Sequence, residues 1–136
     1  MRSLRRYFLM GSLVGMSVGF QSQAAVAQEV VKEASRIVVV RNVKVQDGVV
    51  SGEIVNNSSQ VLRDVELQIR YIWHWKDEKR PGKDAPGRTA YYRLEKEIAP
   101  GASASFTYTP TPPLPSRPDG YFETAVSVAG YTEIIR

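Results

Sequence analysis

The stretch Val65–Trp75, VELQIRYIWHW, decides the fold because apolar and polar side chains alternate along it. The odd-numbered positions hold Val65, Leu67, Ile69, Tyr71, Trp73 and Trp75, and the even-numbered ones hold Glu66, Gln68, Arg70, Ile72 and His74. Successive side chains of a strand point to opposite faces, whereas a helix would scatter the same residues around its axis. The stretch therefore predicts a strand whose odd face is buried and whose even face meets water.

Shorter runs of the same kind surround this strand. Asp47-Gly48 is a preferred hairpin dipeptide, and Gly130 predicts a bulge or bend within the last run. Beside the central strand we expect strands within RIVVVRNVKV (36–45), VVSGEIVNN (49–57), TAYYRLEKEI (89–98), SASFTYTP (103–110) and YFETAVSVAGYTEII (121–135).

The segment TPTPPLPSRPDG (109–120) cannot be a central strand, because proline donates no backbone hydrogen bond. We expect it to cross a sheet edge or one end of the domain. Six or seven strands, frequent turns and the lack of an amphipathic helix predict an all-β, antiparallel β-sandwich over residues 37–136. A small barrel is the alternative.

The first residues have the order of an export signal. Basic Arg2, Arg5 and Arg6 precede an apolar stretch, and the small residues Ala25-Val26-Ala27 follow. This order predicts a signal peptide over residues 1–27, cleaved before Gln28, and a flexible lead-in over 28–36. The apolar stretch contains several glycines and serines and is shorter than the roughly 20 residues that span a bilayer. We expect no stable membrane insertion after signal removal, and a periplasmic or secreted protein.

Two export routes remain open. Arg5-Arg6-Tyr7-Phe8-Leu9 resembles the twin-arginine consensus, but Leu4 and Met10 depart from it. The general secretory route is favoured because any export signal begins with positive charge.

Composition narrows the function. The 136 residues include 18 Lys and Arg against 14 Asp and Glu, and three of the arginines lie in the leader. The nearly balanced mature part gives no electrostatic support for a nucleic-acid partner. The chain has no cysteine, so it has neither a disulfide nor a lipid attachment site, and the domain must be held together by its core.

Two quoted segments carry a family resemblance. GEIVNNSSQVLRDVELQIRY (52–71) and IAPGASASFTY (98–108) resemble the small bacterial exported immunoglobulin-like domains with an FxLYD signature, whose function is unknown. The matching positions are Gly52, Ile54, Asn56, Val65, Tyr71, Pro100, Gly101 and Phe106. The resemblance implies an immunoglobulin-like sandwich and says almost nothing about activity. This chain departs from the pattern in its longer segment after Tyr71, its proline segment and its last strand.

Catalysis has little support in the sequence. A nucleophilic triad would depend on the single histidine, His74, which we expect to face water without a carboxylate partner on its own strand. Zinc or copper sites need several histidine or cysteine ligands, and basic neighbours oppose a calcium site at Asp77, Glu78 and Asp84. A glycosidase pair drawn from Glu95, Glu97, Glu123 and Glu133 would need a deep cleft. We expect no enzyme, cofactor or metal.

The two tryptophans leave one question open. Trp73 is expected in the core, whereas Trp75 belongs either to the core or, with Tyr91, to an exposed aromatic platform at the strand end. We expect a non-enzymatic module that binds or supports another, unidentified envelope protein through its loop end. The expected partner-binding residues are Trp75, Lys76, Lys79, Arg80, Arg88 and Tyr91. The alternative is a small-ligand or carbohydrate-binding module that uses the same aromatics. The oligomeric state stays open.

Overall fold

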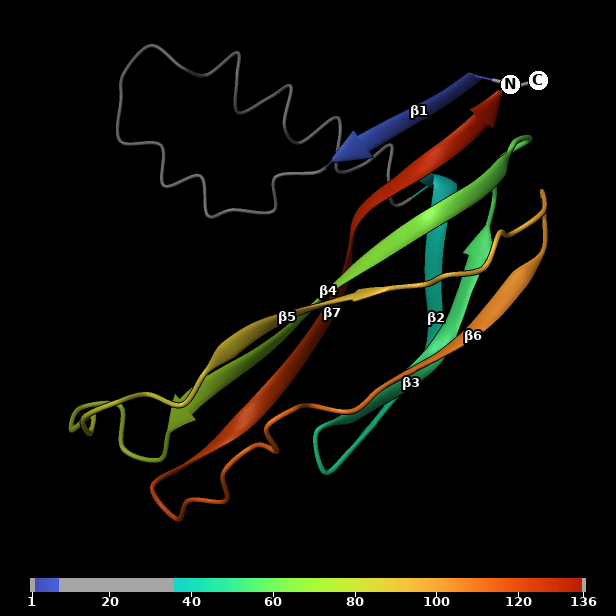
Figure 1. Ribbon diagram of the computed structural model, residues 1–136. Helices are drawn as coiled ribbons and strands as arrows, with labels where there is room; N and C mark the ends of the chain where they lie inside the picture. Colours follow the sequence, from blue (N-terminus) through green and yellow to red (C-terminus); the bar gives the residue numbers. More distant parts are fainter. Residues whose placement is uncertain (1, 8–35, 136) are drawn as a thin grey trace, which may run out of the picture.

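The computed structural model describes residues 2–7 and 36–135, which form an all-β structure (Figure 1). The strands of the described residues are β1 (Arg2–Tyr7), β2 (Val38–Gln46), β3 (Val49–Asn56), β4 (Val61–Trp75), β5 (Arg88–Arg93), β6 (Ser103–Tyr108) and β7 (Gly120–Ile135). Within these ranges no helix is long and apolar enough to cross a bilayer.

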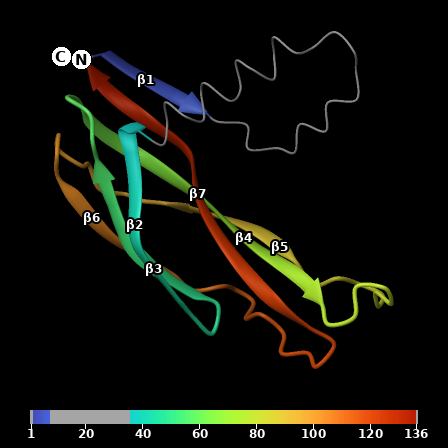
Figure 2. The ribbon, with the colours of Figure 1, turned by 180° about the vertical axis from the view of Figure 1, so that it is seen from behind.

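The strands form two separate antiparallel sheets. One sheet has the order β1-β7-β4-β5 and the other β2-β3-β6. Figures 1 and 2 show the two sheets facing each other, with β4 and β7 as the long diagonal strands of the larger one. The predicted antiparallel sandwich is confirmed at this level, and the strands do not close into a barrel.

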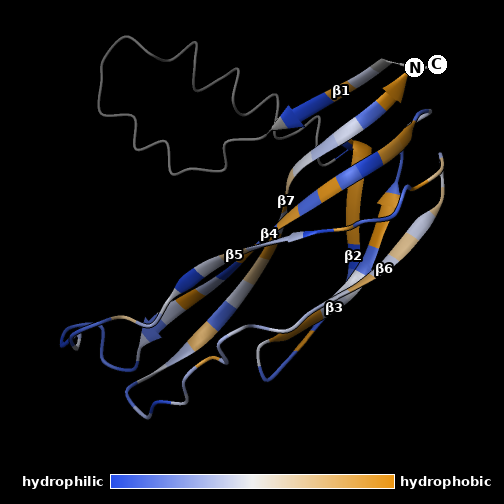
Figure 3. Cartoon of the chain, viewed as in Figure 1, coloured by the Kyte–Doolittle hydropathy of each residue, from blue (hydrophilic) through white to orange (hydrophobic). Residues whose placement is uncertain are grey.

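The alternation in β4 produces the core. Val65, Leu67, Ile69 and Tyr71 are at most 1% exposed, as the odd-face prediction requires. They pack with residues of the facing sheet, namely Val38, Val50, Ile54 and Phe106. Figure 3 shows apolar and polar segments alternating along β4.

The even face of β4 is less open to water than expected. Arg70 is exposed, but Gln68 is only 7% exposed. Its amide donates to the Tyr91 hydroxyl at 3.2 Å, and its Oε1 lies 3.5 Å from Ser127 Oγ. The neighbouring strands β5 and β7 therefore cover a position that β4 alone would leave exposed.

The turn between β2 and β3 is the predicted one. Gln46 pairs with Val49, so Asp47 and Gly48 form a two-residue hairpin loop. Both have positive φ, 51° and 81°, as a type I′ turn requires. This turn lies at the same end of the sandwich as the end of β4 and the start of β7 (Figure 1).

The predicted irregularity at Gly130 is also present. Glu66 pairs with Gly130 and Leu67 with Val128, so Ala129 is an extra residue in β7. A second register shift lies between Arg63 and Glu66 in β4, where Asp64 has a φ of 51°. These shifts turn the end of β7 away from its first half, and that end pairs with β1.

The opposite end of the sandwich is closed by Asn56, which is fully buried. Its side-chain amide donates to the carbonyls of Gln60 at 2.7 Å and Ile98 at 2.8 Å. Its Oδ1 accepts from the backbone N–H and the hydroxyl of Ser58. The side chain is thus fully used in joining the β3–β4 loop to the β5–β6 loop.

The structure describes only the first part of the predicted signal peptide. Arg2–Tyr7 of the predicted signal peptide form β1, and the rest of that peptide, with lead-in residues 28–35, lies outside the described residues.

Thr109–Asp119, here called the proline segment, contains no strand and runs from β6 in one sheet to β7 in the other. It therefore crosses an end of the domain, as its prolines predict.

Candidate binding pocket at the loop end

An open pocket of about 420 Å³ lies where three segments meet at one end of the sandwich. We call it the loop-end pocket. It is lined by Val45, Asp47 and Gly48 of the β2–β3 hairpin, Leu114–Arg117 of the proline segment, Gly120, Tyr121, Phe122 and Thr124 of β7, and Trp73 of β4. The hairpin and proline segment also touch directly, because an added Cβ at Gly48 would lie 2.9 Å from Leu114 Cδ1.

Trp73 is the large aromatic side chain that β4 contributes to this pocket. Its ring packs edge-on against Phe122 at 4.9 Å and Trp75 at 5.7 Å between centroids. The indole is held close to β7 because its neighbour is glycine: a Cβ on Gly120 would overlap the Trp73 ring. Trp73 is therefore partly buried at the pocket and is not a member of the core cluster in which it was expected; it meets the edge of that cluster through Phe122.

The indole N–H of Trp73 is buried and has no hydrogen-bond acceptor within the described part of the chain. A buried donor that lacks an acceptor costs about 1–3 kcal/mol relative to a paired one. The nitrogen has almost no solvent-exposed surface, so a carbonyl or carboxylate of a ligand reaches it only if a neighbouring side chain moves. The pocket wall itself is mixed, with aromatic and aliphatic side chains beside the polar Asp47, Arg117 and Thr124.

Arg117 connects the pocket to both tryptophans. Its guanidinium carbon lies 5.3 Å from the Trp73 ring centroid and 5.4 Å from that of Trp75, within the range of cation–π attraction. It donates to both carboxylate oxygens of Asp119, at 3.0 and 2.6 Å, and to the Asp84 carbonyl at 2.9 Å. The hydrogen bond from Arg117 holds the pKa of Asp119 below its ordinary value.

Trp75 does not form the exposed aromatic platform that the sequence left open. It is half-buried, with Arg117 against its ring and Gly82 so close that an added Cβ would lie 2.9 Å from the ring. The pairing of Gln68 with Tyr91 places Tyr91 on the even face, opposite to Trp75. The platform of Trp75 with Tyr91 is therefore not formed.

None of the other expected binding residues lines the pocket. Lys76, Lys79 and Arg80 are exposed on the charged loop, residues 76–87, which joins β4 to β5. Arg88 donates to the Pro112 carbonyl and so ties β5 to the proline segment. Sequence reasoning missed the pocket itself, because its walls come from segments far apart in the chain.

His74 faces away from the core, as predicted, with its side chain 33% exposed. Its Nε2 lies 2.6 Å from Glu123 Oε2 on β7, and its ring stacks on Tyr121 with centroids 5.1 Å apart. The expectation of no carboxylate partner held for its own strand, but the neighbouring strand supplies one. His74 and Glu123 meet because β4 pairs with β7, and this pairing could not be read from the sequence alone.

The other acidic residues considered for catalysis lie apart in the fold. Glu95 and Glu97 are exposed beyond the end of β5, and Glu133 lies near the other end of β7 from Glu123. Among residues 2–7 and 36–135, no group of three or more His, Cys, Asp or Glu side chains is arranged to hold a metal ion.

The fold and the site define a β-sandwich with an aromatic pocket at one end. Comparisons of the chain with protein-family models, with curated proteins and with solved structures found no match.

Proposed function

We propose that this chain is a non-enzymatic, exported β-sandwich module that binds or supports another envelope protein through its loop end. The observation that carries the proposal is the buried Trp73 N–H without an acceptor at the aromatic loop-end pocket. A peptide carbonyl of a partner protein is the commonest group that supplies such an acceptor. The pocket is open to a partner segment, and a neighbouring side chain has to move before that segment reaches the indole nitrogen.

The composition of the loop end supports a protein partner. Aromatic residues and arginine are enriched in the well-packed centres of protein interfaces, and charged residues lie around them. Here Trp73, Tyr121 and Arg117 all line the pocket. This arrangement favours a partner segment with an apolar or aromatic anchor.

The strand order supports the immunoglobulin-like assignment. Apart from β1, the sheets β2-β3-β6 and β7-β4-β5 correspond to the A-B-E and F-C-C′ strands of such domains. Residues of the FxLYD-type resemblance have matching roles: Gly52 leaves space for the Phe106 ring, and Gly101 has a φ of 74° in the Pro100-Gly101 turn. The proposed signal peptide over residues 1–27 would deliver this domain to the periplasm or outside the cell.

A small ligand or carbohydrate is the second candidate, favoured by one observation. Tyr121 is 62% exposed at the rim of the pocket, on the face of the sheet that it shares with His74, so a sugar ring has an aromatic surface beside the pocket on which to stack. The aromatic originally expected for this role, Trp75, is covered by Arg117.

Site-specific photo-crosslinking tests the proposal. A photoreactive phenylalanine at Tyr121 samples the rim of the pocket, and the same group at Tyr91 is a matched control, because Tyr91 is a similarly exposed tyrosine of the same sheet that does not line the pocket. We expect one defined envelope protein to be linked from position 121 and not from position 91. Val45→Glu, which adds charge to the exposed hairpin wall, should abolish the adduct.

Two results would contradict the proposal. Equal protein adducts from both positions would show non-specific contact. Glycan retention that is lost in Tyr121→Ala, without any protein adduct, would favour the carbohydrate-binding alternative.

A further inference from the structure

Strand β1 pairs with the end of β7. Arg2–Tyr7 pair in antiparallel fashion with Gly130–Ile135, and β1 forms the outer edge of the larger sheet. In the immunoglobulin-like scheme, the seventh strand, G, lies beside F at this position. The described residues place no strand from the second half of the chain there. The first residues of the leader therefore occupy the place of the missing strand.

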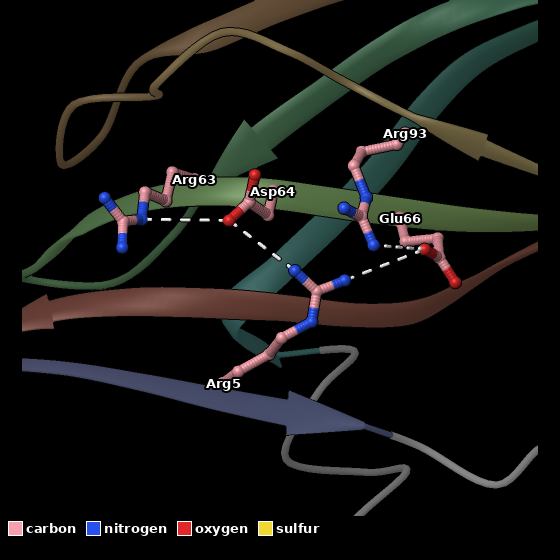
Figure 4. Close-up of polar contacts among 5 residues, drawn as sticks. All are labelled: Arg5, Arg63, Asp64, Glu66 and Arg93. Carbon is pink, nitrogen blue, oxygen red and sulfur yellow. Dashed lines mark hydrogen bonds and ion pairs between the residues drawn. The ribbon is translucent and has the colours of Figure 1, made fainter.

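Ion pairs as well as backbone hydrogen bonds hold β1 on the sheet. Arg5 lies across β7 and places its guanidinium 3.5 Å from Asp64 and 3.7 Å from Glu66, both on β4 (Figure 4). Arg6 lies 3.9 Å from the Glu133 carboxylate. Figure 4 also shows Arg63 and Arg93 beside Asp64 and Glu66, at 3.7 and 3.2 Å.

Adjacent arginines suit this edge because neighbouring side chains of a strand point to opposite faces. Arg5 pairs with Thr132 and Arg6 with Tyr131, so the two reach carboxylates on opposite faces of the sheet. The carboxylates of Glu66 and Glu133 are only 21% and 13% exposed. Partly buried carboxylates are costly without a cation nearby, so the edge favours a basic occupant.

Signal cleavage would remove this occupant. If residues 1–27 are cut off, as the sequence predicts, β1 leaves with them, and Gly130–Ile135 lose their backbone partners on one side. An open sheet edge readily pairs with another extended chain. Asp64 and Glu66 keep Arg63 and Arg93 as partners, whereas Glu133 loses its contact with Arg6, so Glu133 in particular favours a basic side chain on that chain.

We propose that, in the mature protein, the β7 edge over Gly130–Ile135 accepts by strand addition an extended segment of a partner protein that carries two adjacent basic residues. Main-chain hydrogen bonds provide the affinity in this binding mode, and side chains at fixed positions provide specificity. The site is separate from the loop-end pocket. It requires removal of the leader but does not require the pocket to bind anything.

The test uses the protein exported by cells that produce the full chain, and its N-terminus is determined by mass spectrometry. The probe is a fluorescent hexapeptide with the sequence of residues 2–7, RSLRRY, and the control peptide has Glu in place of its fourth and fifth residues. We expect an exported chain that begins at Gln28 and binds the probe at least about tenfold more tightly than the control. Hydrogen exchange should slow at the amides of Gly130–Ile135.

Two protein variants sharpen the test. The full chain with its leader attached should bind the probe about tenfold more weakly, since its own β1 fills the edge, and Arg5→Glu with Arg6→Glu in that chain should restore binding. Glu133→Lys in the exported protein should weaken probe binding, whereas Tyr121→Ala should not. Tyr121→Ala thus separates failure of this site from failure of the pocket.

Three results would overturn the proposal. The first is an exported chain that still begins at Met1. The second is equal affinity for the two peptides. The third is probe binding that protects amides elsewhere but not those of Gly130–Ile135.

Discussion

The hydroxyl of Tyr71 donates a hydrogen bond of 2.6 Å to the carbonyl of Gly48, and this bond joins the two sheets. Tyr71 lies in β4, and Gly48 lies in the hairpin between β2 and β3 of the other sheet. Burial raises the pKa of the Tyr71 hydroxyl, so the group stays protonated and able to donate. The bond fixes the hairpin wall of the loop-end pocket over the end of β4.

Removing this hydroxyl should lower stability without changing the fold. We expect Tyr71→Phe to reduce the free energy of unfolding by about 1 kcal/mol, because the Gly48 carbonyl loses its partner. Urea denaturation measures the loss. Tyr121→Phe is the control and should change stability by less than about 0.5 kcal/mol, since Tyr121 is exposed. Equal losses in the two variants would contradict a role for the Tyr71–Gly48 bond.

The buried side-chain amide of Asn56 should matter more for stability than the exposed amide of its neighbour Asn57. Asn56→Asp replaces two donors with a carboxylate that faces the carbonyls of Gln60 and Ile98, so we expect a loss of at least about 3 kcal/mol at pH 7. The loss should shrink in acid, where the protonated carboxyl can donate again. Asn57→Asp, one residue further on, loses only an exposed hydrogen bond to the Arg36 carbonyl and should cost less than about 1 kcal/mol at either pH. Denaturation at pH 7 and pH 4 measures both variants, and equal losses at the two pH values would contradict the explanation.

A side chain at Gly120 should displace Trp73. The added Cβ would overlap both the Trp73 ring and the backbone carbonyl oxygen of His74, so we expect Gly120→Ala to cost at least about 3 kcal/mol and to change the near-ultraviolet circular dichroism of the tryptophans. Gly101→Ala is the control, because its added Cβ meets no atom within 4 Å although its φ is positive. The control should lose stability through backbone strain alone and keep the wild-type aromatic spectrum. An unchanged spectrum in Gly120→Ala would show that Trp73 is not held by this contact.

The Arg117–Asp119 ion pair should make the stability of the folded protein depend on pH. Because Arg117 lowers the folded-state pKa of Asp119, the pair contributes stability above the ordinary carboxyl pKa and loses it as the pH falls through the lowered value. Carbon-detected NMR titration should give a midpoint for Asp119 below that of an ordinary aspartate. Arg117→Gln should move that midpoint upward. A midpoint that does not move would rule out Arg117 as the cause.

The sequence predicted features whose signals lie within a few residues. The alternation from Val65 to Tyr71 identified the core face of β4, and Asp47-Gly48 identified the hairpin, because strand period and turn conformation are local properties. The position of Gly130 likewise identified the register shift in β7.

Features that depend on long-range pairing could not be predicted in the same way. The contact of His74 with Glu123 requires β4 and β7 to be neighbours, and the covering of Trp75 by Arg117 requires the proline segment to cross that end. The strand at Arg2–Tyr7 was missed because its residues also have the composition of an export signal. The expected binding loop was near the pocket, but the pocket walls came from other segments.

The long antiparallel pairing of β4 with β7 has a mechanical consequence. The register runs from Val61 with Ile134 to Trp75 with Gly120, almost the full length of both strands. Tension applied along these strands would load their hydrogen bonds together, in shear, whereas a sideways pull at one end would open them one after another. The molecule should therefore resist stretching along its long axis far better than peeling at its tips, a useful property for a spacer between two attached bodies.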